Sequence, residues 1–190
     1  MRHSFQVISV IAFFWLSACA WQRVPEPPQY VSEAPLPLQI GVILVDNPPS
    51  AVYGPGVINE WKELRLFEQI IYPYREGDRV DAVLNLAING GWVGKGAAAG
   101  FVTGLTLGLA GTAIGPSMTG THDAVAVLAQ AGREIGRYSA NVVTTVEWGM
   151  QANVGEVSNK ADALQRKRLA HELATRIRSD RQALTSKAAN

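Results

Sequence analysis

The stretch that decides the fold is DAVAVLAQAGREIGRYSANVVTTVEW, which runs from Asp123 to Trp148. Both halves, Asp123–Gln130 and Ile135–Trp148, are rich in β-branched and alternating apolar residues, as half-buried strands are. AGRE, residues 131–134, separates them as a turn. We therefore predict a β-hairpin here. The residues expected on one side of its second strand are Val142, Thr144 and Val146.

Upstream of the hairpin, two short apolar runs predict further strands. LQIGVILVD, Leu38 to Asp46, is bounded by prolines, and VDAVLNLAI, Val80 to Ile88, alternates large residues. Between them, near-helical spacing of apolar side chains predicts an amphipathic helix over residues 57–67. QIIYPY, residues 69–74, predicts a short edge strand, because its proline cannot donate to a central ladder.

The C-terminal stretch predicts a long helix that begins near Asn159, with Asp162 in its first turn. The apolar residues expected along one face are Leu169, Leu173, Ile177 and Leu184. The order strand, helix, strands, hairpin, helix predicts an α/β fold: a mixed sheet with helices packed on one side, with a glycine-rich apolar hairpin insert at residues 89–121. Over about residues 38–185 this order resembles the amino-terminal α/β domain of the periplasmic TolB protein and the periplasmic domain of the curli secretion lipoprotein.

The amino terminus has the organisation of a secretory signal. A basic start is followed by the apolar run FQVISVIAFFWL and then by small residues before Cys19. The alternative, an uncleaved anchor, is disfavoured because the run is shorter than the ~20 residues that span a bilayer. The sequence LSAC consists of Leu16, Ser17, Ala18 and Cys19.

LSAC resembles the lipobox of bacterial lipoproteins. The resemblance implies that the signal, residues 1–18, is removed and that Cys19 carries diacylglycerol and an acyl chain. Acylation also accounts for the thiol, since Cys19 is the only cysteine and cannot form an internal disulfide. Position 20 is Ala rather than Asp, which in the resembled class favours the outer membrane, with the domain facing the periplasm.

The mature chain would contain 172 residues, enough for one domain with a real core, and 16 basic and 16 acidic residues. Its net charge therefore favours no particular partner. Residues 19–37 hold the lipidated cysteine and five prolines, a composition typical of a semi-stiff tether. We expect the folded domain at residues 38–186.

The glycine-rich insert fails the tests for nucleotide binding. In a P-loop, the residue five positions before Gly94 would be glycine and the residue after Lys95 would be Ser or Thr, but Asn89 and Gly96 occupy these positions. A dinucleotide loop would need one residue fewer before Gly100 and an acid about 20 residues on. We expect no nucleotide cofactor.

Catalytic motifs are also missing from the sequence. The mature chain has two histidines, His122 and His171, which with no free cysteine do not form a usual zinc site. His122 and Asp123 are adjacent, so in a strand their side chains point to opposite faces. We expect His122 at the mouth of the insert, His171 on the solvated side of the last helix, no metal and no enzymatic activity. The basic residues of that helix fit a solvated face or contact with acidic lipid or protein.

The insert contains 26 uncharged residues between Lys95 and His122, preceded by Trp92 as an interfacial anchor. Its regularly spaced glycines are Gly96, Gly100, Gly104 and Gly108. This spacing gives one smooth face on a helix and resembles the glycine zippers of Gram-negative envelope lipoproteins. Because the flanking strands belong to one domain, the insert must return to the same side of a membrane.

Three structures of the insert stay open. A helical hairpin has arms too short to cross the bilayer. A β-hairpin is long enough to cross, and requires a ring of subunits that closes a shared barrel. The third possibility is an apolar segment folded against its own domain.

The leading hypothesis is a non-enzymatic lipid-anchored protein of the outer membrane, accessory to envelope maintenance, assembly or transport, whose insert makes a membrane or self-association contact. The alternative is an oligomeric secretion or pore component with the insert as its spanning hairpin. A periplasmic enzyme or ligand-binding domain is the third class. The expected partners are outer-membrane lipid, further copies of the chain or another envelope protein, and no nucleic acid.

Overall fold

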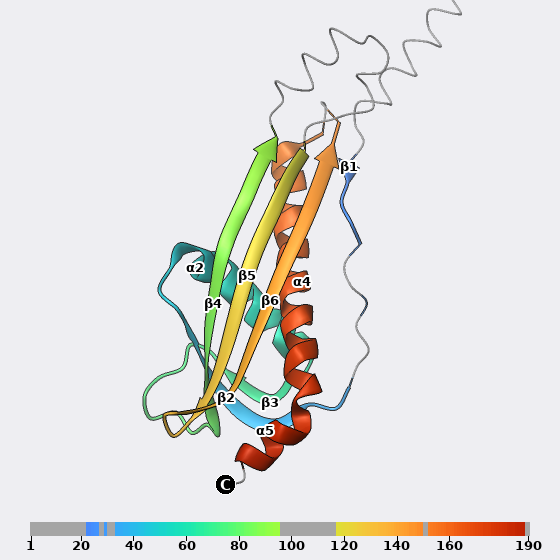
Figure 1. Ribbon diagram of the computed structural model, residues 1–190. Coiled ribbons are helices and arrows are strands. Elements are labelled where there is room, and N and C mark those ends of the chain that lie inside the picture. Colours follow the sequence, from blue (N-terminus) through green and yellow to red (C-terminus); the bar gives the residue numbers. More distant parts are fainter. Residues whose placement is uncertain (1–21, 27–28, 30–32, 96–116, 150–151, 189–190) are drawn as a thin grey trace, which may run out of the picture. The chain divides into compact units, whose positions relative to one another are not determined.

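A computed structural model describes residues 22–26, 29, 33–95, 117–149 and 152–188. The predicted α/β class is confirmed: these residues form a mixed six-stranded sheet with helices packed on it. The elements in chain order are β1 Gln22–Arg23, β2 Leu36–Leu44, α2 Pro48–Glu63, β3 Phe67–Ile71, β4 Ala82–Lys95, β5 Ser117–Gln130, β6 Arg133–Trp148, α4 Val154–Ser179 and α5 Arg181–Ala188 (Figure 1).

The sheet order is β1-β6-β5-β4-β2-β3. The chain divides into two compact units, and β4, β5, β6 and α4 contribute residues to both. Unit 1 takes its described residues from Met1–Pro25, Trp92–Gly120 and Thr144–Asp162. Unit 2 takes its described residues from Glu26–Gly91, Thr121–Val143 and Ala163–Asn190.

The predicted strands of unit 2 are present, and β3 is an edge strand as expected. β2 lies between β3 and β4 and is parallel to both. Pro37 lies inside β2, where the register with β3 shifts between Leu36 and Gln39. Pairing of β2 with β4 begins only at Ile40. The missing backbone N–H of Pro37 therefore costs no hydrogen bond to β4.

The predicted hairpin is confirmed as β5 and β6. Its turn is Ala131 and Gly132, both with positive φ, of 48° and 78°. Two such residues make the turn that matches the right-handed twist of paired strands. The three residues predicted on one side of β6 are all buried: Val142, Thr144 and Val146.

The first helix begins nine residues before its predicted start, because NPPS is a helix start and not a strand boundary. The Asn47 side chain accepts a hydrogen bond of 2.8 Å from the backbone N–H of Ser50. Pro48 and Pro49 occupy the first positions, where a helix has no use for the missing N–H. The helix ends at Glu63, four residues before the predicted end, and Arg65 follows with φ 49°.

The last helix also starts earlier than Asn159. Asn153 caps it by accepting a 3.2 Å hydrogen bond from the N–H of Glu156, and α4 runs from Val154. The helix is interrupted at Asp180, whose carboxylate accepts a 2.8 Å hydrogen bond from the Tyr138 hydroxyl. The predicted apolar face is confirmed, divided between α4 and α5; Leu169, Leu173, Ile177 and Leu184 are all fully buried.

The core of unit 2 lies between one face of the sheet and the helices. The buried strand residues have even numbers in β2, β4 and β5, so they share a face, and α2 and α4 cover that face (Figure 1). Trp61 of α2 is fully buried and donates a 3.0 Å hydrogen bond from its indole to the carbonyl of Ala170. This bond joins the two helices at the centre of the core.

The end of the predicted tether is held by unit 2. The Arg181 guanidinium donates to the carbonyls of Ala34 and Pro35, at 3.0 and 2.8 Å. Arg178, whose side chain is 6% exposed, lies 3.4 Å from a Glu33 carboxylate oxygen and donates to the carbonyl of Leu64 at 3.1 Å. Residues 33–35 therefore belong to the folded structure.

Candidate functional site

A small apolar cluster organises unit 1. Its fully packed members are Val146 of β6 and two residues of α4, Val157 and Ala161. Partly buried apolar residues pack around them: Val24, Trp92, Met118, Trp148 and Ala152. The cluster thus contains two tryptophans among few residues, both partly buried.

Trp92 is held from two directions. Its indole N–H donates a 2.8 Å hydrogen bond to the Asp162 carboxylate on α4. Its ring lies against Gly120 of β5, so closely that a Cβ at this position would collide with the ring. A glycine beneath an aromatic ring on the neighbouring strand is a device that lets the ring lie flat on the sheet. The indole is therefore fixed by packing and by a charge-assisted hydrogen bond.

The strand order of unit 1 collects three chain segments at one end of the sheet. β1 pairs with β6 through Gln22 opposite Trp148 and Arg23 opposite Glu147. β5 begins at Ser117 and β4 ends at Lys95, and these strands follow β6 in the sheet. With about 4.8 Å between neighbouring strands, β1 and β4 are separated by about 14 Å across the sheet. The amino-terminal segment and both flanks of the glycine-rich stretch thus share one sheet end.

Apolar side chains are also exposed on unit 1. Val93 of β4 is 70% exposed and Val154, at the start of α4, is 58% exposed. Single exposed valines are common on protein surfaces. Val93 follows Trp92 in β4, so the two side chains point to opposite faces of the sheet, and both lie near the sheet end that carries Lys95.

The charges of unit 1 are paired and nearly balanced. Arg23 and Glu147 approach to 3.7 Å, and Lys160 and Glu156 to 2.7 Å. The hydrogen bond from Lys160, with its charge, lowers the pKa of the Glu156 carboxyl. Asp162 is the remaining carboxylate among the described side chains and accepts from Trp92. The described side chains of unit 1 therefore carry no excess of positive charge.

A shallow groove of about 370 Å³ lies on unit 2 between β6 and α4. Its lining residues are Gln29, Asn141, Val142, Val143, Arg168, His171, Glu172 and Thr175. Burial, and then the nearby charge of Lys167, lower the pKa of the His171 imidazole.

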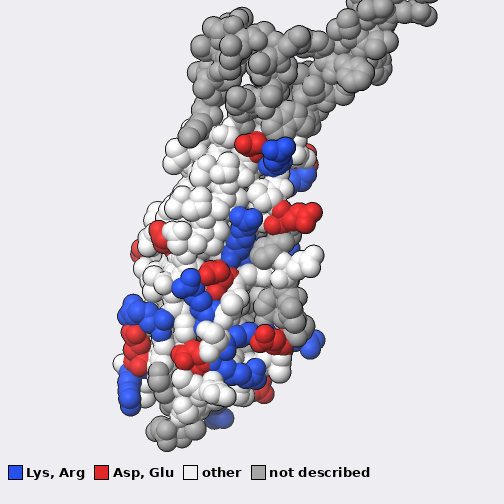
Figure 2. Space-filling view, turned by 45° about the vertical axis from the view of Figure 1, so that its right-hand side comes forward, with Lys and Arg blue, Asp and Glu red and all other residues white. Residues whose placement is uncertain are grey.

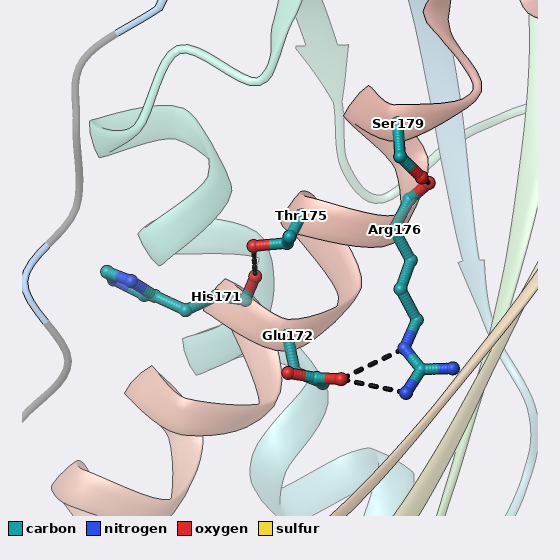
Figure 3. Close-up of polar contacts among 5 residues, drawn as sticks. All are labelled: His171, Glu172, Thr175, Arg176 and Ser179. Carbon is teal, nitrogen blue, oxygen red and sulfur yellow. Dashed lines mark hydrogen bonds and ion pairs between the residues drawn. The ribbon is translucent and has the colours of Figure 1, made fainter.

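The polar contacts of the groove do not form a catalytic set (Figure 3). Glu172 is engaged by the Arg176 guanidinium at 2.8 Å, and Thr175 donates to the backbone carbonyl of His171 at 2.9 Å. The imidazole points away from the Glu172 carboxylate (Figure 3). His171 and Thr175 are therefore not arranged as a base and its nucleophile.

Three arginines of the last two helices are engaged within unit 2. Arg176 pairs with Glu172, Arg178 with Glu33, and Arg181 with backbone carbonyls. Figure 2 shows basic and acidic side chains interspersed on the face it draws. This mixture favours the solvated-face interpretation of these charges over a basic patch for acidic lipid.

His122 does not lie at the mouth of the insert, as expected from sequence, but in the interior of unit 2. It is fully buried, with its ring centroid 4.4 Å from that of Tyr53 on α2. Opposite it, Gly90 has φ 114° and leaves no room for a Cβ against the Thr121 carbonyl. The close approach of the strands accounts for this glycine.

Among the described residues, no three His, Cys, Asp or Glu side chains are grouped to hold a metal ion. Within the same residues, no helix is both long enough and apolar enough to cross a bilayer.

The structure describes one of the residues predicted for membrane or self-association contact, Trp92, which lies in unit 1. The others lie outside the described residues: the lipobox residues Leu16, Ser17, Ala18 and Cys19, and the glycines Gly96, Gly100, Gly104 and Gly108. Sequence reasoning missed Asp162 and Trp148 as its neighbours. Trp148 had a signal, since it ends the strongest strand pattern, but its distance from Trp92 along the chain hid their shared cluster.

No protein-family model matches the chain, and no curated protein matches it. Among solved structures, the chain is similar to a provisionally assigned lipoprotein from Caulobacter crescentus, with 17% identity, a TM-score of 0.44 and coverage of 78% of this chain and 91% of that chain. It is also similar to a minor lipoprotein from Acinetobacter baumannii, with 10% identity, a TM-score of 0.43 and coverage of 76% and 90%. At these scores the likenesses transfer no function to this chain.

Proposed function

We propose that the protein is a non-enzymatic lipoprotein of the Gram-negative outer membrane, anchored through acyl chains on Cys19. The observation that carries the proposal is LSAC directly after an apolar run, with Cys19 as the only cysteine. Several acyl chains on one residue give stable anchoring, whereas a single chain binds only marginally. The protein then serves envelope maintenance, assembly or transport as an accessory, with its domain in the periplasm.

The arrangement of unit 1 supports this proposal. Cys19 is three residues from Gln22, so it lies within about 11 Å of the start of β1 by the reach of the chain alone. β1 shares its sheet end with Lys95 and Ser117, the flanks of the glycine-rich stretch. An acyl anchor and an apolar segment that leave one end of a sheet can meet the same membrane surface.

Metabolic labelling with palmitate tests the lipid anchor. The Cys19→Ser variant should incorporate no label, keep its signal and be missing from the outer membrane. Ser17→Ala, which keeps a small residue before the cysteine, is the matched control and should be processed normally. Label and normal sorting in Cys19→Ser would end the proposal.

The second candidate function, an oligomeric secretion or pore component, is favoured by one observation. β4 and β5 are neighbours in the sheet and run in opposite directions (Figure 1). They end at Lys95 and restart at Ser117, so the 21 intervening residues suffice for a spanning hairpin with 9 to 11 residues per strand. Size in mild detergent decides between the two functions: a ring supports the pore component and a monomer rules it out.

A further inference from the structure

Unit 1 exposes apolar side chains at the sheet end that carries Lys95 and Ser117. Val93 and Val154 are more than half exposed, and Trp92 and Trp148 are partly exposed beside the small cluster. Tryptophan is enriched where a protein crosses the headgroup region, because its ring has an apolar body and a polar edge. The rigid hold on Trp92 by Asp162 and Gly120 means that little conformational freedom would be lost on contact.

The charges of the same surface indicate which property of the bilayer it recognises. Residues 19–25, 92–120 and 144–162 of unit 1 carry three cations, Arg23, Lys95 and Lys160, and three carboxylates, Glu147, Glu156 and Asp162. Attraction to acidic headgroups needs an excess of basic residues, and this unit has none among those side chains. Recognition would therefore depend on apolar contact and not on lipid charge.

The position of the anchor makes such a weak contact effective. This step rests on the proposed lipidation of Cys19, which holds unit 1 within about 11 Å of an acylated residue through the chain leading to Gln22. A contact between tethered partners forms at the high effective concentration that a short linker imposes. Apolar contacts too weak to bind vesicles from solution can then hold the unit on the surface.

We propose that unit 1 docks on the bilayer through the end of its sheet, with Trp92 and Trp148 at headgroup depth on the face that α4 covers. Val93, on the opposite face of β4, and Val154, at the start of α4, then contact lipid at the same sheet end. The occupant of this surface is thus the phospholipid of the membrane that holds the acyl anchor. The contact orients the sheet end that carries Lys95 and Ser117 toward the membrane.

Fluorescence quenching by brominated lipid tests the docking. The lipidated full chain is reconstituted into phosphatidylcholine vesicles with brominated acyl chains, with Trp21 replaced by Phe because it is two residues from the anchor. Three proteins are compared: one retaining Trp61 only, one retaining Trp61 and Trp92, and one retaining Trp61 and Trp148. The added Trp92 or Trp148 should be quenched and blue-shifted, and Trp61, fully buried in unit 2, should be unaffected.

Two exposed valines provide a test variant in unit 1 and a matched control variant in unit 2. In the chain that keeps all three tryptophans, Val93→Asp should reduce the quenching, because it places a charge on the docking surface. Val143→Asp, at a β6 valine of unit 2 that is 52% exposed, should leave the quenching unchanged. Both sites are on strands and exposed, so neither change should prevent folding, and raising the salt concentration should alter neither result.

The possible results separate the docking from the anchor. If the protein floats with the vesicles while Trp92 and Trp148 are quenched no more than Trp61, the lipid anchor stands and the docking is wrong. Equal quenching of all three tryptophans also overturns the docking, because unit 2 would then contact lipid as well. A chain that carries no acyl group and does not float removes both proposals.

Discussion

Unit 1 and unit 2 bury their side chains to very different extents. The core of unit 2 contains large side chains from the sheet, α2, α4 and α5, with Trp61 fully buried at the contact of two helices. Among the residues that the structure describes, the cluster of unit 1 has three buried members, none larger than valine, and its two tryptophans are partly exposed. Among the described residues, most of the buried apolar side chains therefore belong to unit 2. In the described part of unit 1, Val93 and Val154 are more than half exposed.

Matched tryptophan substitutions give the sharpest test of this difference. Trp61→Ala should lower the free energy of unfolding by about 3–5 kcal/mol, because it leaves a cavity in the closed core of unit 2. Trp92→Ala should cost clearly less, because part of its ring already faces solvent. Denaturant unfolding followed by circular dichroism measures both losses. Equal losses would contradict the division into a strong and a weak core.

Arg178→Met tests whether the start of the fold is held by unit 2. The change removes the donor to the partly buried Leu64 carbonyl and the partner of Glu33, so we expect a loss of about 1–3 kcal/mol. Glu33→Gln should cost less, because the Glu33 side chain is 56% exposed. Thermal unfolding compares the two variants. A neutral Arg178→Met would mean that residues 33–35 are not stabilised by this contact.

The smallest expected effect is a pH dependence confined to unit 2. Burial and Lys167 lower the pKa of His171 in the folded state, so between pH 7 and 5 the unfolded chain binds more protons. Stability is therefore fully present above the unfolded pKa of about 6.5 and falls as the pH falls. His171→Gln should reduce this loss, and Lys167→Met should reduce it in part. Urea unfolding at pH 7 and pH 5 measures the difference.

Periodicity predicted the strands well, because side chains of half-buried strands alternate whatever lies above them. It misplaced the starts of both main helices. The N-cap residues Asn47 and Asn153 each accept a hydrogen bond from an N–H three residues on, but local sequence also allows Asn-Pro to end a strand. Prolines at the first helical positions are favourable there and disruptive elsewhere, so a proline pair alone does not distinguish the two outcomes.

The candidate surface was less accessible to sequence reasoning than the fold. Trp92 could be predicted as a contact residue because it precedes an uncharged run. Its neighbours Trp148, Asp162 and Gly120 come from three other elements, and no sequence motif connects them to Trp92. His122 was placed wrongly for the same reason. Whether a strand residue is covered depends on the helix that packs on it, here α2 through Tyr53.

The sequence by itself determined the α/β class and the hairpin, because periodicity and turn residues are local patterns. The acylation of Cys19, which a local processing motif indicates, stays a prediction. Only the tertiary structure decided that β1 pairs with the end of β6, that residues 33–35 are held by two arginines, and that the tryptophans Trp92 and Trp148 share one cluster. These features depend on which strands become neighbours. That choice follows from how the whole chain buries its apolar surface, which no short segment encodes.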